Sequence, residues 1–429
     1  MTVEVALIVP DAPFLLEPRS FPHLGVLYLS AALKQAGYKA RVYDLTGGYK
    51  LPKVREEIVG ITATSPQFKS ALEIRDEIRE YNPDALFVLG GPHATVAPET
   101  CVGFDVVVAG EGDEAIVDIA RRYEKEGRFK AVLKPEPIRD LDKLPYPDRD
   151  AVDLSSYKYY LLGDRCTNIQ SQRGCPFGCA FCCGRTIKTY RWARYRSPEN
   201  IEGEVDQIIS RYRIKALMFY DDEFNLNKKH ALEVCKMLKR KGVLWRCFIR
   251  TDLFDEELAK AMAEAGCVEV GAGVETGSPK IKKIINKGTT VEQDYKAVEL
   301  CRKYGIKFKA FLIVGLPGED YETFNETRRW LATAKPDNFD ATIFMPYPGS
   351  EIWEHPERYD IFFDKEEIVR SGFVGTYYKG ASGGPERSFV STSKLSAEEI
   401  ARLRYQLDVE FGRMAVTPWS GTDVISYRR

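Results

Sequence analysis

Two stretches of the chain alternate short apolar runs with longer amphipathic segments. In residues 1–125 the apolar runs are rich in β-branched residues and end in Gly, Pro, Asp or Thr. Strands that are apolar on both faces and alternate with helices predict a parallel, doubly wound α/β sheet, whose ligands bind at the carboxyl ends of the strands. The predicted strands are 3–10, 40–45, 58–64, 85–90 and 106–110, and the predicted helices are 24–37, 70–81 and 113–125.

The second alternation covers residues 166–346. It favours a partial or full parallel barrel of six βα units, with an active site at the carboxyl ends of the strands. The predicted strands are 168–173, 216–220, 245–251, 268–274, 307–314 and 340–345. The predicted helices are 201–211, 228–241, 256–265, 291–304 and 321–334.

The remaining segments have a different character. Residues 126–165 mix charged residues with four prolines, which predicts an extended linker. Ser396 followed by Glu399 is a capping box that opens a helix reaching about residue 413, after a Gly-rich loop at 375–384. We therefore expect four parts: an N-terminal domain of residues 1–135, a linker of 136–165, a barrel of 166–346, and a small, mostly α-helical C-terminal domain of 347–429 that closes the cavity.

Composition and charge exclude several classes of protein. Lys and Arg number 62 against 63 Asp and Glu, so the net charge of −1 argues against binding nucleic acid through bulk positive charge. No run approaches the length of about eighteen apolar residues that a membrane helix needs. The N-terminus also lacks the positive region and apolar core of a signal peptide, so we expect a cytoplasmic protein without a membrane span.

Four of the ten cysteines fall between Cys175 and Cys183, and in a reducing compartment such clusters more often bind metal than each other. Cys175, Cys179 and Cys182 have the spacing C-x3-C-x2-C on a loop after the first predicted barrel strand. Three thiolates can hold three irons of a cubane cluster and leave the fourth iron open. The alternatives are a zinc loop or inert cysteines. Zinc needs a fourth ligand nearby, yet Cys183 adjoins Cys182 and the four histidines lie far along the chain.

Three predicted strands of the N-terminal region end in small or polar residues. The third is followed by Thr62 to Pro66, the fourth by Gly90 to His93, and the fifth by Gly110 to Gly112. Glycines let a backbone approach a bulky ligand, although ordinary βα turns have the same composition. Because all three loops share one edge of the predicted sheet, we favour a platform for a large ligand.

These motifs resemble those of a known superfamily. The cysteine loop, with Phe181 as its aromatic residue, resembles the signature loop of radical S-adenosylmethionine (SAM) enzymes. Further motifs of the same superfamily are matched by 219–224, 271–278 and 314–319. Segments 22–29, 90–95 and 110–114 resemble the cobalamin-binding domain fused to many of its members. The loop 11–14 lacks the histidine that ligates cobalt in classical cobalamin domains, and so resembles fused members that bind cobalamin without one.

The resemblance implies a Rossmann-like cobalamin domain followed by a partial TIM-type radical SAM barrel. It implies a [4Fe-4S] cluster on Cys175, Cys179 and Cys182, together with SAM and cobalamin as cofactors. It also implies an electron donor of the flavodoxin or ferredoxin type. The candidate SAM contacts are Phe181, Asp221, Asp222, Arg250, Glu275 and Gly315. The candidate cobalamin contacts are Thr62, Thr64, Ser65, Gly90, Gly91, His93, Gly110, Glu111 and Gly112.

Two of these assignments have plainer alternatives. Asp221 and Asp222 could cap a helix, and Arg250 could pair with Glu275. The expected reaction is C-methylation, in which a 5′-deoxyadenosyl radical removes hydrogen from an unactivated carbon that then takes a methyl group from methylcobalamin. The alternatives are cyclisation, oxidation or C–C coupling without methyl transfer, and a cobalamin or metal sensor. As substrate we expect a protein side chain or α-carbon, for example the glutamine of methyl-coenzyme M reductase.

Overall fold

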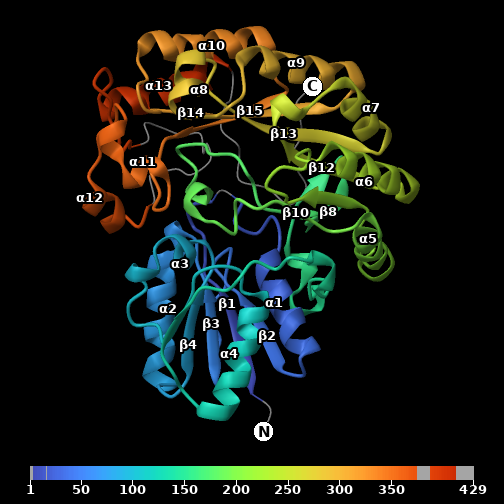
Figure 1. Ribbon diagram of the computed structural model, residues 1–429, viewed down its shortest axis with the longest axis vertical. Helices are drawn as coiled ribbons and strands as arrows, with labels where there is room; N and C mark the ends of the chain where they lie inside the picture. The colour runs from blue at the N-terminus through green and yellow to red at the C-terminus, as the bar shows by residue number, and fades with distance from the viewer. Residues whose placement is uncertain (1–2, 16, 374–386, 412–429) are drawn as a thin grey trace. The chain divides into compact units, whose positions relative to one another are not determined.

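The computed structural model describes residues 3–15, 17–373 and 387–411 of the 429-residue chain. It divides into two compact units, Met1–Lys158 and Tyr159–Arg429, which we call the first and second units. Figure 1 shows a sheet with covering helices in each unit. The finer division into four parts stays a prediction.

The first unit is built on a six-stranded sheet in which every neighbouring pair is parallel. The strand order is β2-β1-β3-β4-β5-β6, so the topological switch point lies between β1 and β3. The strands are β1 (Glu4–Val9), β2 (Lys39–Asp44), β3 (Ile58–Thr62), β4 (Leu86–Gly90), β5 (Val106–Val108) and β6 (Ala131–Leu133). The predicted doubly wound sheet is confirmed.

Alternate residues of each central strand of this sheet pack into two separate cores. Val5 and Leu7 of β1 face a core shared with α1 (Leu24–Gln35) and α4 (Asp113–Glu126). Their neighbours Ala6 and Ile8 face the other core, shared with α2 (Phe68–Tyr81) and α3 (Pro92–Val96). Burial on both faces explains why these strands are apolar throughout.

The second unit contains six parallel strands in chain order, with β7 (Tyr160–Leu161) added antiparallel at one edge. The described strands β8 and β15 do not pair with each other, so the sheet is an open half-barrel, as the partial-barrel prediction requires. The strands are β8 (Asp164–Ile169), β11 (Ala216–Phe219), β12 (Leu244–Ile249), β13 (Cys267–Glu275), β14 (Lys307–Val314) and β15 (Asn338–Ile343). A separate two-stranded ribbon pairs β9 (Gln172–Arg173) with β10 (Arg194–Tyr195).

Helices follow the half-barrel strands at nearly the predicted places (Figure 1). They are α5 (Pro198–Tyr212), α6 (Lys228–Lys241), α7 (Glu256–Glu264), α9 (Val291–Tyr304) and α10 (Tyr321–Ala334). The sequence did not predict α8 (Pro279–Ile284), α11 (Glu351–Glu354) or α12 (Lys365–Arg370). The predicted capping box is confirmed, because the Ser396 and Glu399 side chains cap the start of α13 (Ala397–Glu410). The Gly-rich loop 375–384 lies outside the described residues.

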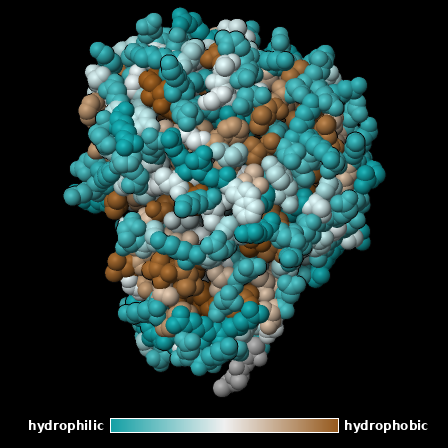
Figure 2. Space-filling view, in the orientation of Figure 1, coloured by the Kyte–Doolittle hydropathy of each residue, from teal (hydrophilic) through white to brown (hydrophobic). Residues whose placement is uncertain are grey.

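Two sequence predictions are wrong in position. The first barrel strand is Asp164–Ile169 rather than 168–173, because the chain leaves the sheet after Ile169. The segment 126–165 is not wholly a linker, since Ala131–Leu133 pairs with β5 as the sixth strand of the first sheet. No helix within the described ranges is long and apolar enough to cross a membrane. The face drawn in Figure 2 is mostly hydrophilic, with hydrophobic residues in scattered groups.

Candidate active site

Two aspartates that follow β11 hold the start of the cysteine loop. Asp221 accepts hydrogen bonds from the backbone N–H groups of Ser171 and Gln172, at 2.6 and 3.0 Å. Asp222 accepts one from the backbone N–H of Gly174, at 2.7 Å. Burial raises the pKa of Asp221 to about 7, and these hydrogen bonds counteract the rise by stabilising the carboxylate. Neither residue is the N-cap of α6, which is Asn227, so the capping alternative is wrong.

The middle of the cysteine loop is fastened by backbone carbonyl groups. The Gly178 carbonyl accepts from the Arg185 guanidinium at 2.7 Å and from the Asn286 amide at 2.8 Å. The Ala180 N–H donates to the carbonyl of Ile285, at 2.8 Å. The loop is therefore held from several elements, which fixes the backbone that carries the thiols.

Two of the three thiols predicted to bind the cluster, Cys175 and Cys182, have raised pKa values and lie near the third, Cys179. Burial raises the pKa of Cys175 to about 11 and of Cys182 to about 12, and the charge of Cys179 raises both further. The backbone N–H groups of Phe177 and Gly184 act in the opposite direction on Cys175 and Cys182 respectively. A thiolate is therefore costly here unless cationic metal compensates its charge.

This donor set fits an iron–sulfur cluster better than a single metal ion. Within the described ranges, no three His, Cys, Asp or Glu side chains are grouped tightly enough to hold one ion. A cubane cluster takes one thiolate per iron, so its ligands stand apart around a larger group. N–H groups directed at two of the sulfurs also suit a cluster site.

Charged side chains from the carboxyl ends of β11, β12 and β13 gather with Lys287, which follows α8. The ammonium group of Lys287 donates to a carboxylate oxygen of Glu275 at 2.9 Å. Arg250 pairs with Asp252 at 3.0 Å, and its guanidinium carbon lies 3.5 Å from the centre of the Phe177 ring. The alternative in which Arg250 pairs with Glu275 is therefore wrong, because each has a different partner.

Glu223 is a further charged group of this cluster, and sequence reasoning missed it. Its carboxylate forms no hydrogen bond or ion pair with any residue that the structure describes, although its backbone carbonyl accepts from the Leu226 N–H at 3.3 Å. Burial raises its pKa to about 7, while the charges of Lys287 and Arg250 lower it. The signal was present, because Glu223 directly follows two acidic residues at the end of a strand.

A local distortion positions Glu275 toward Lys287. Glu275 has a φ of +63° in the left-handed region, and the pairing of β13 with β14 shifts register beside it. A side chain at Gly273 would collide with the Glu275 carboxylate and the Lys287 ammonium group. Such a conformation costs about 1–3 kcal/mol in a non-glycine residue, and strain of this kind concentrates at functional sites.

The other two predicted SAM contacts lie in different surroundings. Phe181 is half-buried within the cysteine loop. Gly315 follows β14, where its N–H donates to Glu319 at 2.5 Å and a Cβ would approach Ile400 of α13 to 2.8 Å. The small size of Gly315 thus serves packing of the turn against α13. Contact of these residues with SAM stays a prediction.

In the first unit, the predicted cobalamin residues lie in three loops at the carboxyl ends of β3, β4 and β5. Gly90 is half-buried, and a Cβ added there would meet nothing within 4 Å. Gly91 has a φ of +93°, and a Cβ there would approach the Thr62 hydroxyl to 2.6 Å. Thr64 donates from its hydroxyl to the Gln67 amide oxygen at 2.9 Å. The edge therefore combines open backbone at Gly90 with internally bonded polar groups.

The third loop of this edge has its own internal contacts. The carboxylate of Glu111 accepts from the Ile138 N–H at 2.8 Å. Gly110 has a φ of +147°, and a Cβ at Gly112 would approach Leu29 to 3.2 Å. Glycine is thus required at Gly110 by its backbone conformation.

His93 is buried within the same edge, and both ring nitrogens have partners. Nδ1 lies 3.0 Å from the Ser65 hydroxyl, and Nε2 lies 3.0 Å from the Thr100 hydroxyl. The ring stacks on Phe68, with 4.0 Å between the ring centres. Burial lowers the pKa of His93 to about 4, so the ring is neutral at physiological pH. Its observed role is to join the loops after β3 and β4, and contact with cobalamin stays a prediction.

A polar cluster at the ends of β1 and β2 was also missed. Arg19 donates to the Ser156 hydroxyl at 3.0 and 2.9 Å and to the Thr46 carbonyl at 2.9 Å. The Asp44 carboxylate accepts from the Tyr157 hydroxyl at 2.5 Å. Ser156 and Tyr157 are more than a hundred residues from their partners, so spacing along the chain gave no signal.

Comparison with known proteins agrees with both units. The family model of the radical SAM superfamily matches residues 169–331, and that of the B12 binding domain matches residues 19–120. An uncharacterized methyltransferase of Pyrococcus horikoshii is 32% identical over 78% of each chain. The anaerobic magnesium-protoporphyrin IX monomethyl ester cyclase of Rubrivivax gelatinosus is 30% identical over 82% of this chain and 69% of its own.

A solved structure shares the fold. The radical SAM methyltransferase TsrM of Kitasatospora setae, determined with cobalamin and a [4Fe-4S] cluster, matches with a TM-score of 0.66 and 21% identity. The match covers 83% of this chain and 75% of TsrM. The cysteine loop, the half-barrel, the family models and these relatives agree that the chain belongs to the radical SAM superfamily, among the enzymes that carry a B12 binding domain.

Proposed function

We propose that this enzyme is a cobalamin-dependent radical SAM C-methyltransferase acting on an unactivated carbon. The observation that carries the proposal is the set of three interacting thiols, Cys175, Cys179 and Cys182, beside a cluster of charged residues. The methyltransferase of Pyrococcus horikoshii supports methyl transfer as the outcome.

The residues of the cysteine loop have distinct tasks in this proposal. When bound, a [4Fe-4S] cluster with an open iron supplies the electron that cleaves SAM, and cobalamin supplies the methyl carrier. Cys175, Cys179 and Cys182 would hold the cluster as thiolates. Asp221 and Asp222 position the loop through its backbone N–H groups rather than by touching the metal.

The charged cluster would bind SAM by charge complementarity. SAM presents an ammonium group, a carboxylate and a sulfonium. Glu223 is half-buried and its carboxylate has no direct partner in the described residues, so it would accept from the ammonium group. Arg250 and Lys287 supply the positive charge that the SAM carboxylate needs, while Glu275 holds Lys287 in place.

The edge of the first unit would hold cobalamin on open backbone and neutral groups. Gly90 offers free space at the end of β4. The two nitrogens of His93 already have partners, so we propose that His93 supports the platform from inside and does not ligate cobalt. Measuring cobalamin binding to variants would test which of the nine predicted residues contact the cofactor.

The test uses the full chain after anaerobic reconstitution with iron, sulfide and cobalamin. With SAM and dithionite, we expect 5′-deoxyadenosine from radical cleavage and S-adenosylhomocysteine from methylation of the bound cobalamin. Methyl-labelled SAM then carries its label to the substrate once that is supplied. A reconstituted chain that retains the cluster but no cobalamin would overturn the proposal.

One of the relatives favours a different reaction. The relative from Rubrivivax gelatinosus is a cyclase by name, so ring closure without methyl transfer is the alternative reaction. It predicts 5′-deoxyadenosine but no label from methyl-SAM in the product. The two relatives give no support to the glutamine of methyl-coenzyme M reductase as substrate, and a protein α-carbon stays a prediction.

A further inference from the structure

We propose that the surface beside the cysteine loop is the docking site of a small acidic protein that carries one electron. The inference rests on the proposed function, which requires such an electron. Residues 183–196 contain five basic residues and no acidic one, in a chain whose net charge is −1. This segment directly follows the last of the three cysteines.

The basic segment touches the cysteine loop itself. The guanidinium of Arg191 donates to the Pro176 carbonyl at 3.2 Å, and that of Arg185 donates to the Gly178 carbonyl at 2.7 Å. Both carbonyls lie between Cys175 and Cys179 in the chain. Pro176 is exposed although Cys179 is buried, so the loop reaches the surface where the basic segment meets it. Electrons cross short distances most readily, which makes this the natural place for entry.

The positive charges of the segment are not all available. Arg196 is buried against Glu204 at 2.5 Å, and Arg185 forms an ion pair with Glu351. Lys188 and Arg191, by contrast, are exposed and have no carboxylate partner within the described residues. They therefore carry uncompensated charge toward solvent.

Two further residues extend this surface. Trp192 is 43% exposed, which is unusual for so large an apolar side chain. Lys283 is exposed near the end of α8, two residues before Ile285, whose carbonyl accepts from Ala180 of the cysteine loop. We call Lys188, Arg191, Trp192 and Lys283 the basic rim.

An acidic carrier protein fits the basic rim better than other anions. Opposite charge at an interface steers encounters and raises association rates by about 10- to 1000-fold. Trp192 offers the kind of aromatic contact that is enriched in protein interfaces. Three cations are few for nucleic acid, which is held through many phosphate contacts. In the step itself one electron leaves the carrier and enters the cluster, and no bond is formed or broken.

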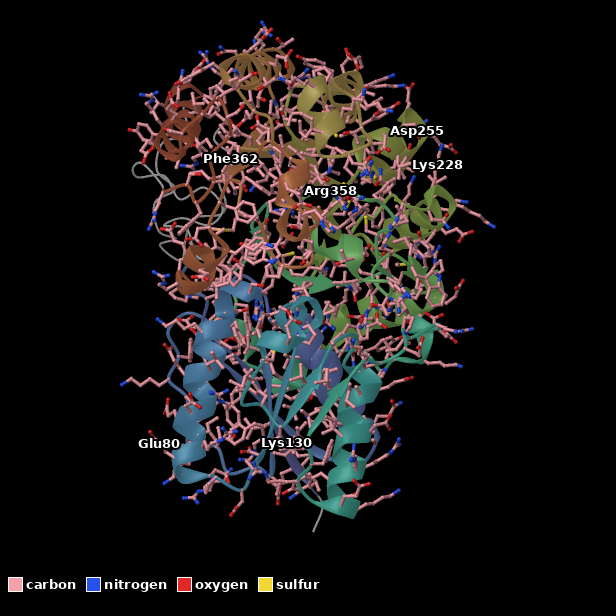
Figure 3. All side chains as sticks on the ribbon, turned by 60° about the vertical axis from the view of Figure 1, so that its left-hand side comes forward. Glu80, Lys130, Lys228, Asp255, Arg358 and Phe362 are labelled. Carbon is pink, nitrogen blue, oxygen red and sulfur yellow. The ribbon has the colours of Figure 1, made fainter. Side chains whose placement is uncertain are left out.

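The test compares two pairs of charge reversals in the reconstituted full chain. The rim variant is Lys188→Glu with Arg191→Glu. The control is Lys229→Glu with Lys236→Glu, the same change of charge on α6, the helix whose Lys228 pairs with Asp255 (Figure 3). The measurement is the rate of cluster reduction by reduced flavodoxin in stopped flow. At low salt we expect the rim variant to be slower by at least about tenfold and the control by less than about twofold.

Ionic strength sharpens this test. The difference between the rim variant and the wild type should shrink as salt is added, because exposed charges are screened. Equal rates for the rim variant and the control at low salt would overturn the proposal.

Two further measurements separate this proposal from the proposed function. Dithionite needs no protein docking site, so at high salt, where the steering of this small anion by surface charge is screened, it should reduce all three proteins at the same rate. If dithionite-reduced protein fails to cleave SAM, the proposed function is lost while the docking rates still stand. If no cluster assembles, carbodiimide crosslinking to oxidised flavodoxin decides, with links expected at Lys188 and Lys283. Links confined to other lysines would refute the docking site.

Discussion

The carboxyl-end edges of the two sheets differ in how their polar groups are satisfied. In the second unit, the Glu223 carboxylate lacks a direct partner among the described residues, and burial raises the pKa of Cys175 and of Cys182. In the first unit, His93 is bonded at both ring nitrogens and Thr64 is bonded to Gln67. The first edge is complete without a ligand, whereas the second contains charges that a ligand would satisfy.

The difference matches the chemistry expected of each edge. SAM and an iron–sulfur cluster carry charge, and buried charge is stable only when paired. Cobalamin is large and held over a broad area, so a firm surface with open backbone at Gly90 suits it. Each prediction below tests whether the polar groups of the second edge need a ligand, or whether those of the first edge are satisfied without one.

The largest expected effect comes from removing one thiol of the second edge. Cys179→Ala should abolish cluster retention and SAM cleavage, because Cys179 is a buried member of the interacting set. Iron and sulfide analysis with visible absorption measures the loss. Cys183→Ala is the matched control and should keep the cluster, since Cys183 adjoins a predicted ligand without being one. Loss of the cluster in both variants would contradict the assignment of three specific cysteines.

The sequence could predict this part of the site because its information is local. Three cysteines within eight positions lie on one loop in any fold, and the C-x3-C-x2-C spacing therefore identified them. The roles of Asp221 and Asp222 could not be predicted, because they depend on backbone N–H groups about fifty residues away. The same contacts explain the misplaced first barrel strand. The N–H groups of Ser171 and Gln172 bond to Asp221, so that segment leaves the sheet.

The alternation of strands and helices was predictable for a similar reason. Strands buried on both faces, such as β4 and β1 after its first residue Glu4, are apolar and stand out in the sequence. The short strand β6 has only three residues and is followed by Pro135, so it offered no comparable pattern. Its place depends on pairing with β5.

The next largest effect is on how the stability of the protein depends on pH, and it tests whether His93 at the first edge is satisfied without a ligand. The folded state holds the pKa of His93 near 4, below the usual 6.5, so it disfavours the protonated ring. Stability is therefore full above pH 6.5 and falls as the pH drops toward 4, by about 3 kcal/mol in the free energy of unfolding. His93→Gln should remove this part of the slope in urea titrations of the full chain without cofactors.

His355→Gln is the control for that measurement, because the side chain of His355 is 45% exposed. Amide exchange in β4 and α3 would locate the acid effect in the first unit. An unchanged slope in His93→Gln would show that the burial of His93 does not govern this edge.

A smaller effect is expected from the unsatisfied carboxylate of the second edge. Glu223→Gln removes the charge that would meet the SAM ammonium group, and should weaken SAM binding by about 2 kcal/mol, or roughly 30-fold. Equilibrium binding of SAM to the reconstituted protein measures this. In the wild type, affinity should rise as the pH increases through about 7, because Glu223 becomes ionised there, and the variant should lack that rise. Glu233→Gln on α6 is the control, and equal affinity of both variants would contradict the role of Glu223.

The smallest effect, near zero, is expected at His23, a histidine beside the loop that follows β1. Its Nδ1 accepts a hydrogen bond from the Val26 N–H at 3.3 Å and caps α1, so the neutral ring carries its proton on Nε2. Burial lowers the pKa of His23, which keeps the ring neutral. A protonated Nε2 has no lone pair for cobalt, so the bound cofactor should have no ligand from this histidine.

His23→Asn keeps a side-chain oxygen for the helix cap, and should leave both stability and the electron paramagnetic resonance spectrum of bound cob(II)alamin unchanged. Protein labelled with 15N-histidine separates ring nitrogens of the protein from those of the cofactor. A splitting of the spectrum by protein 15N that disappears in His23→Asn would contradict this prediction. It would mean that His23 ligates cobalt, and that the first edge, like the second, needs its ligand to satisfy a polar side chain.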